Sequence, residues 1–167
     1  MGGSIVRAEG EGEKRWFYGG GLHTWKASAN ETNGAFFVLE DSLVKGKCTP
    51  LHRHTDHDEL VYVIEGELLH YSDGVERRVQ RGGTVVTPRG VAHAFTVVSE
   101  TARMLFVQAP GSAEAFYRNA SEPAGEANGP VDFGKIGACA RETGVTEILG
   151  PPPFAPSQDA HPRDPVT

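Results

Sequence analysis

The sequence lacks several features that would define its class at once. It has only two cysteines, Cys48 and Cys139, which lie far apart and form neither a CxxC pair nor a Cys/His finger spacing. The N-terminal region has no secretory apolar stretch. These absences predict a reduced, cytoplasmic protein in which Cys48 is an ordinary buried or half-buried thiol.

The sequence also lacks any run rich in lysine and arginine. It carries 16 Lys and Arg against 22 Asp and Glu, for a formal net charge of −6. Nucleic acid and anionic membrane surfaces attract clustered positive charge, so neither is expected as a partner. The 167 residues, 38% of them hydrophobic, are enough for one domain with a core of its own.

Short β-type runs separated by turn residues fill the chain between about residues 21 and 110. Asn33-Gly34 and Asp73-Gly74 are typical of tight hairpin turns, and Gly66 interrupts an extended run. No convincing 3.6-residue period occurs there, so an all-β barrel or jelly roll with mainly antiparallel strands is expected. The predicted strands are 22–26, 35–44, 49–54, 59–65, 67–71, 75–79, 84–87, 93–98 and 102–108.

The flanking segments differ in character from this β region. Residues 1–20 are expected to form an N-terminal arm, and 111–149 a segment with one or two short helices. The first helix would span 112–119 with Ser112 as its cap, and the second 131–143 with Ile136, Ala140 and Val131 on one face and Gly144 at its end. Residues 150–167 hold six of the 11 prolines and are expected to be an extended or disordered tail.

Four polar side chains are predicted to enter the apolar interior together. His52 and His54 alternate along one strand and therefore share a face, while Glu59 shares its face with Val61 and Val63. His93 lies on the same strand face as Phe95. Burial of a carboxylate with three imidazoles is unfavourable unless a cation compensates, so the set predicts a divalent metal site.

This set lacks the cysteine thiolates typical of structural zinc sites, which favours an open, catalytic centre. Nitrogen and carboxylate donors accept Ni, Mn, Fe, Co, Zn or Cu, and the sequence does not select among them. His57 is a rival ligand, with a solvent-facing or cavity-rim position as the alternative. His23, His70 and His161 have no comparable partners and are treated as ordinary polar positions.

The spacing of these residues resembles that of the cupins. Residues 46–66 match G(X)5HXH(X)4E(X)6G, and residues 82–93 match G(X)5PXG(X)2H, although Val97 stands where the second motif often has Asn. The resemblance implies a single cupin barrel, a double-stranded β-helix, with His52, His54, Glu59 and His93 as metal ligands. It also implies a homodimer, in which Leu60, Tyr62 and Ile64 are candidates for cover by a partner or a second sheet.

The single-domain layout, the Gly-rich first hairpin, the run at residues 88–95 and the ending at residues 144–152 resemble bacterial monocupins of the quercetin 2,3-dioxygenase type. That resemblance implies cleavage of a flavonol by dioxygen, with Glu59 as both ligand and general base. A metal-dependent isomerase or polyketide cyclase, and a non-catalytic small-molecule-binding cupin, remain alternatives. A small apolar or aromatic substrate is expected, because the predicted lining is apolar: Phe36 (or its neighbour Phe37), Trp25, Val61, Val63, Phe95, Met104 and Phe106.

Overall fold

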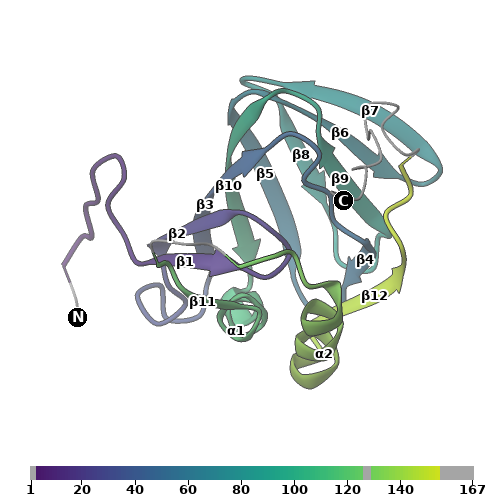
Figure 1. Ribbon diagram of the computed structural model, residues 1–167. Coiled ribbons are helices and arrows are strands. Elements are labelled where there is room, and N and C mark those ends of the chain that lie inside the picture. Colours follow the sequence, from purple (N-terminus) through teal and green to yellow (C-terminus); the bar gives the residue numbers. More distant parts are fainter. Residues whose placement is uncertain (1–2, 126–128, 155–167) are drawn as a thin grey trace, which may run out of the picture.

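A computed structural model describes residues 3–125 and 129–154 of the chain. The strands form two β-sheets that face each other, and the predicted all-β architecture is confirmed (Figure 1). The strands are β1 Lys14–Phe17, β2 Leu22–Ala27, β3 Phe37–Val44, β4 Leu51–His54, β5 Asp58–Glu65, β6 Glu67–Ser72, β7 Val75–Gln80, β8 Thr84–Thr87, β9 His93–Val97, β10 Thr101–Ala109, β11 Ser121–Pro123 and β12 Thr146–Gly150.

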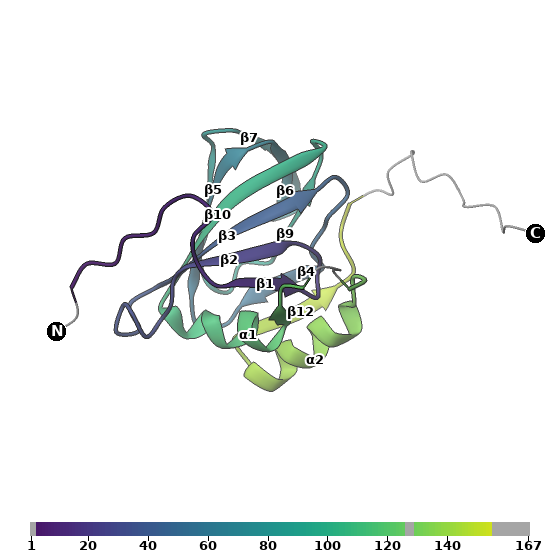
Figure 2. The ribbon, with the colours of Figure 1, turned by 60° about the vertical axis from the view of Figure 1, so that its left-hand side comes forward.

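Every strand pairing is antiparallel within the described residues. One sheet has the order β11-β1-β2-β3-β10-β5-β8, and the other has the order β12-β4-β9-β6-β7. Two helices, α1 Glu114–Asn119 and α2 Phe133–Thr143, lie beside each other at one end of the barrel, where Figure 2 shows them below β1 and β12. The helices thus cover one end of the space between the sheets.

Alternating side chains produce the core. Along β10 every second residue is buried, and β3 and β5 show the same two-residue period, as a strand with one face on a core requires. The buried faces meet in one hydrophobic cluster that includes Phe37, Leu39, Val63, Leu68 and Met104, each at most 1% exposed. This cluster holds the two sheets in the positions that bring β4, β5 and β9 together.

The predicted turns have the expected backbone angles. Asp73 and Gly74, with φ of 53° and 77°, join β6 to β7 as a two-residue hairpin. Asn33 and Gly34 also have positive φ, at 53° and 81°. They lie, however, within the longer connection 28–36 between β2 and β3 instead of in a tight hairpin.

The helices begin differently from the prediction. Ser112 caps no helix: it lies in a 3-10 turn, Gly111–Ala113, that leads into α1 without a side-chain cap. Helix α2 starts later than expected, with Asp132 as the cap that accepts a hydrogen bond from the Lys135 N–H at 2.9 Å. Ile136 and Ala140 are buried as predicted and Gly144 ends the helix in the left-handed region, but Val131 is exposed.

Three strands lie where an arm or helices were expected, and one of them, β11, lies in the predicted helical segment and pairs with β1. β1 falls within the predicted N-terminal arm, and β12 lies at the end of the predicted helical segment and pairs with β4. The first residues of the Pro-rich tail continue this contact, because the Leu51 N–H donates to the Pro151 carbonyl at 3.4 Å. The prediction for the rest of the tail, and for His161, lies outside the described residues. None of the helices described here has the length and apolar character needed to cross a membrane.

Candidate metal centre and its cavity

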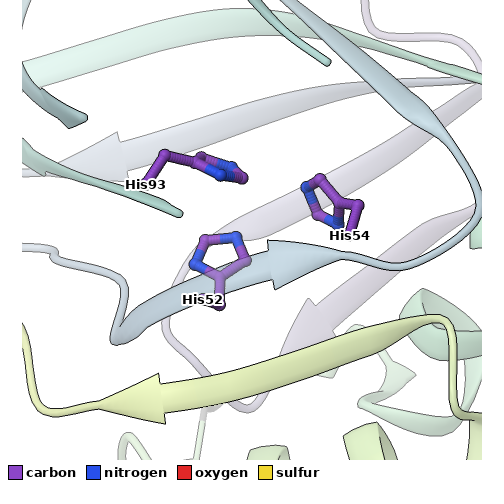
Figure 3. Close-up of side chains that lie close together, drawn as sticks. All are labelled: His52, His54 and His93. Atoms are coloured by element: carbon purple, nitrogen blue, oxygen red, sulfur yellow. The ribbon is translucent and has the colours of Figure 1, made fainter. Parts of the chain in front are cut away.

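Three histidines from two neighbouring strands come together inside the barrel. His52 and His54 lie on β4, and His93 lies on β9 directly opposite His52. One ring nitrogen of each lies within 4.8 Å of the others, and Figure 3 shows the three rings converging. Two ligands each about 2.1 Å from one ion are at most about 4.2 Å apart, so these imidazoles form a group able to hold a metal ion with small side-chain adjustments.

Backbone carbonyls orient two of the three rings. His52 Nδ1 lies 2.8 Å from the Pro50 carbonyl oxygen, and His93 Nδ1 lies 3.0 Å from the Val91 carbonyl oxygen. These bonds place the ring hydrogen on Nδ1 and leave Nε2 as the lone-pair nitrogen. The arrangement is the one that metal-ligating histidines commonly have.

The loop of the second motif positions His93 beside the histidines of the first motif. Gly90 has a φ of 81°, which favours glycine, and its N–H donates to the His54 carbonyl at 2.7 Å. This bond ties the loop before β9 to the end of β4. The glycine at that position of the motif therefore has a structural role in bringing the two histidine-bearing segments together.

Glu59 faces the histidines from β5 in the opposite sheet. Its carboxylate oxygens lie 3.4 Å from His54 Nε2 and 3.5 Å from His93 Nε2, and the side chain is almost fully buried. The amide nitrogen of Gln108, the residue paired with Glu59 across β10, donates to Glu59 Oε2 at 2.7 Å. Gln108 also donates to the Tyr117 hydroxyl at 3.0 Å, so Glu59 belongs to a buried polar network.

The protonation preferences of these residues reflect their burial and mutual contacts. Burial would raise the pKa of the Glu59 carboxyl, but the imidazoles of His54 and His93 outweigh it and hold that pKa well below its usual range. Burial, together with the neighbouring imidazoles, lowers the pKa of His52 well below the ordinary value. His52 is therefore neutral at neutral pH, which is the form that binds a metal.

A cation suits these residues because several buried polar atoms have no hydrogen-bond partner. Both ring nitrogens of His54 and Nε2 of His93 are buried and unpartnered among the described residues. Unsatisfied buried polar atoms are unfavourable by about 1–3 kcal/mol each, whereas one divalent ion would coordinate imidazole nitrogens and the carboxylate together. The donor set of three histidines and one carboxylate thus fits a transition metal.

His57 is neither solvent-facing nor at the rim of the cavity, the two positions expected for it as a non-ligand. It is fully buried, its ring lies 4.2 Å from that of His54, and its Nδ1 lies 2.7 Å from Asp56 Oδ1. It is absent from the group of three converging histidines. The solvent-facing and rim positions are therefore wrong, because His57 packs behind His54 with Asp56 as its partner.

An apolar cavity opens beside the histidines. His52, His54 and Glu59 line one part of it, and most of the remaining wall is hydrophobic. Of the predicted apolar lining, Phe95 and Phe106 do line this cavity.

The other predicted lining residues lie elsewhere. Val61, Val63 and Met104 are buried in the hydrophobic core and are not part of the cavity wall, and Trp25 is likewise a core residue. Phe36 is a correction: it is 41% exposed, because the strand begins at Phe37, whose ring takes the inward position. Strand alternation predicted an inward phenylalanine at this point but did not decide between the two neighbours.

Much of the cavity wall comes from segments that the sequence pattern did not connect with the site. β1 contributes Phe17, α1 contributes Phe116 and Tyr117, α2 contributes Phe133 and Ile136, and β12 contributes Ile148. These residues are distant in sequence from the two motifs, and no local spacing links them to the site. Lys47 and the buried pair His23 and Asp41 also line the cavity, so His23 is not an ordinary polar position.

The remaining polar predictions have simpler outcomes. Cys48 and Cys139 are both unpaired and half-buried. His70 is buried behind His93, with ring centroids 6.0 Å apart. Val97, which stands at the Asn position of the second motif, is a buried core residue.

Comparison with known proteins agrees with this architecture. Residues 41–108 match the family model for the cupin domain. The chain is 31% identical over 118 residues to quercetin 2,3-dioxygenase of Bacillus subtilis (strain 168), and the match covers 71% of this chain. It covers 35% of the relative, so the chain spans about a third of that protein's length.

Solved structures share the fold at lower identity. KdgF from Halomonas sp. has a TM-score of 0.58 and 18% identity, with 65% of this chain and 94% of that chain covered. A predicted oxalate decarboxylase from Thermotoga maritima has a TM-score of 0.57 and 20% identity, with 64% and 99% covered. The polyketide cyclase RemF from Streptomyces resistomycificus has a TM-score of 0.51 and 22% identity, with 65% and 80% covered. At these identities the likeness shows the fold alone.

Proposed function

Because this chain contains a cupin domain, we propose that it is a metal-dependent dioxygenase that cleaves an aromatic or enolic substrate of the flavonol type with dioxygen. The similarity to quercetin 2,3-dioxygenase supports the reaction class. One divalent transition metal would be held by His52, His54, Glu59 and His93.

The observation that carries this proposal is the position of the histidine group in the wall of an apolar cavity. His52 and His54 line the cavity directly, together with Glu59. Four protein ligands leave coordination positions for small molecules on an ion that prefers five or six, as an open catalytic site requires. A ligand in the cavity would approach the metal through the apolar part of the cavity.

The ion would act as a Lewis acid that makes a bound enolic hydroxyl more acidic. Glu59 is the residue placed to accept that proton, since its carboxylate is unprotonated and lies at the cavity wall. Gln108 holds one carboxylate oxygen in place through its hydrogen bond. The aromatic residues of the wall would exclude water and orient a flat ring.

The size of the cavity constrains the substrate. Its free volume is about 50 Å³, against roughly 300–1,000 Å³ for sites that enclose drug-sized ligands. A ligand with several rings would therefore need Phe133 and Ile136 of α2 to move outward. A single-ring enolic compound would need less movement.

The test is a substrate screen with metal-loaded protein under oxygen. Protein loaded separately with Ni, Mn, Fe, Co, Cu or Zn is mixed with flavonols and single-ring enolic compounds, and oxygen uptake and carbon monoxide release are measured. The proposal predicts oxygen consumption that depends on the metal, with carbon monoxide from a flavonol. Absence of both across all metals and substrates would contradict it.

The same screen identifies the alternatives. Turnover without oxygen consumption would indicate an isomerase or a polyketide cyclase, and saturable binding without product would indicate a non-catalytic small-molecule-binding protein. A cytoplasmic location and a homodimer remain part of the proposal.

A further inference from the structure

A second polar group lies in the same cavity, apart from the metal-binding histidines. His23 on β2 and Asp41 on β3 are paired across the two strands, and His23 Nε2 lies 3.2 Å from Asp41 Oδ2. The two side chains are 2% and 3% exposed, and both line the cavity. Burial of a carboxylate and an imidazole is unfavourable because both lose their hydration, so compensating hydrogen bonds are expected.

Each member of this pair has a polar atom without a partner. Asp41 Oδ1 and His23 Nδ1 are buried and form no hydrogen bond within the described residues. The His23 ring stacks on Phe17, with ring centroids 4.5 Å apart, and also lies near the Tyr117 ring, with centroids 5.6 Å apart. The pair is thus rigid and incompletely satisfied, as expected of a site that completes its hydrogen bonds with a ligand.

Lys47 brings a positive charge to the same cavity. This half-buried lysine lies in the loop between β3 and β4, and its Nζ donates to the Cys48 carbonyl at 3.1 Å. The ammonium lies 5.7 Å from the Phe17 ring centroid and 5.6 Å from that of Phe95, which are two aromatic walls of the cavity. An ammonium has three hydrogens to donate, so this position suits recognition of an oxygen atom.

The pKa of Lys47 is consistent with this placement. Burial lowers the pKa of its ammonium, and the negative charge of Asp41 partly offsets the effect. The charge of Asp41 therefore acts on Lys47, and both side chains line the same cavity. Together they present one acceptor and one donor to the same space.

Aromatic side chains separate this group from the metal centre. The Tyr117 ring contacts His23, while its hydroxyl accepts a hydrogen bond from Gln108, which also donates to Glu59. Phe95 lies on the strand that carries His93, on the same face, and forms one of the rings beside Lys47. A flat ligand lying against these rings would have polar contacts at two places and apolar contacts between them.

We propose that His23, Asp41 and Lys47 form a second polar subsite of the cavity, which binds a phenolic hydroxyl of the substrate away from the metal centre. The hydroxyl donates to Asp41 and accepts from Lys47. An ether at that position cannot donate to Asp41, and a carboxylate would be repelled by it. The preferred substrate class is therefore a flat enolic compound with an additional phenolic hydroxyl. This inference rests on the proposed function only for the binding of the enolic group to the metal.

The test compares matched ligands that share the metal-binding end. The dissociation constants of 3,4′-dihydroxyflavone and 3-hydroxy-4′-methoxyflavone are measured on metal-loaded protein. The corresponding 7-substituted pair is also measured, because its hydroxyl lies at a different distance from the metal-binding 3-hydroxyl. A hydrogen bond to a charged group corresponds to a preference of roughly tenfold or more. Wild-type protein should bind the hydroxyl member of at least one pair about tenfold more tightly than the methoxy member.

Variants identify the residues responsible for that preference. In Asp41→Asn and Lys47→Met the preference, taken as the ratio of the two dissociation constants of a pair measured on the same variant, should fall to about threefold or less. Lys45→Met is the matched control, because Lys45 is an exposed lysine two residues away that pairs with Glu100. It should keep the wild-type preference. Thermal melting confirms that each variant is folded, and Lys47→Met, at a half-buried loop position, provides the test if Asp41→Asn does not fold.

Two results would overturn the subsite. One is a wild-type protein with no hydroxyl preference in either pair, or with no binding of any hydroxyl-bearing flavone. The other is a preference that persists in both folded variants. Because the readout is binding, oxygen uptake without the preference refutes the subsite alone, whereas the preference without oxygen uptake refutes only the proposed reaction.

Discussion

At the scale of single residues, the site combines side chains that are costly to bury separately. His54 has two ring nitrogens without a hydrogen-bond partner among the described residues, and Glu59 is a buried carboxylate that accepts a hydrogen bond from Gln108 and lies 3.4 Å from His54 Nε2. Strand alternation and motif spacing predicted these inward positions, because both are local properties of the sequence. Spacing alone could not show that Gln108 would hold Glu59, since that contact depends on tertiary packing.

Glu59→Gln separates metal binding from proton transfer. The amide can still coordinate weakly and can accept the Gln108 hydrogen bond, but it cannot accept a proton. We expect the variant to retain metal by elemental analysis and to lose activity by about 10²–10⁴-fold, the usual contribution of a general base. Activity near that of wild type at equal metal content would remove Glu59 as the base.

His70 predicts how stability changes with pH in metal-free protein. Burial, followed by the charge of His93, lowers the pKa of His70 to about 4, against about 6.5 in an unfolded chain. Between these values the unfolded state binds more protons, so the free energy of unfolding decreases as the pH falls from about 6.5 to about 4. The contribution of His70 has a ceiling of about 3 kcal/mol.

The comparison is between wild type and His70→Asn, by chemical denaturation from pH 7 to pH 4. His52 and His57 also have lowered pKa values and keep part of the slope in the variant. The variant should nevertheless lose less stability than wild type over this interval. Equal losses in the two proteins would contradict the role given to His70.

At the scale of elements, β4 is held on both sides by strands that come later in the chain. β9 carries His93 against His52, and β12 pairs with the other edge, placing Ile148 opposite His52. The ligand strand is thus fixed partly by a segment about a hundred residues later. This pairing also brings α2, which precedes β12, over the cavity.

The sequence predicted the strands between residues 21 and 109 well and missed those outside this range. The strand from Thr84 to Thr87 was predicted at its observed bounds, because turn residues flank a run of β-branched residues. β1, with Lys14 and Arg15, has no such composition and becomes a strand through pairing with β2 and β11. Tertiary pairing of this kind leaves no local periodic signal.

The cap of α2 offers a test of how the helix covers the cavity. Asp132→Ala removes the acceptor of the Lys135 N–H and should lower the free energy of unfolding by about 0.5–2 kcal/mol. Denaturant titration measures the change. Glu142→Ala, an exposed position in the same helix, is the control and should stay within about 0.5 kcal/mol of wild type. A loss in the control as large as that in Asp132→Ala would contradict a capping effect.

At the scale of the whole molecule, the barrel has a continuous hydrophobic core that does not include the metal ligands. The core cluster extends from Phe17 on β1 to Ala140 on α2. The protein should therefore remain folded without metal, and bound metal should add stability through linkage. The expected homodimer stays a prediction at this scale.

Metal removal measures that linkage. Free metal at about 100 times its dissociation constant adds about 2.7 kcal/mol of stability. For a chain of this size, this corresponds to a rise in Tm of roughly 5–10 °C. Calorimetry of chelator-treated and reloaded protein should show the shift with unchanged far-ultraviolet circular dichroism. An equal Tm for the chelator-treated and the reloaded protein, or a metal-free chain that is unfolded, would be inconsistent with this account.

The metal centre is the central claim, and elemental analysis of the purified protein after metal loading and removal of excess ion tests it most directly. The measurement is made on wild type and on His93→Ala, which removes the ligand contributed by β9 while leaving both histidines of β4. The account predicts about one ion per chain in wild type and almost none in the variant. A wild-type protein that retains no ion, or a variant as fully occupied as wild type, would contradict it.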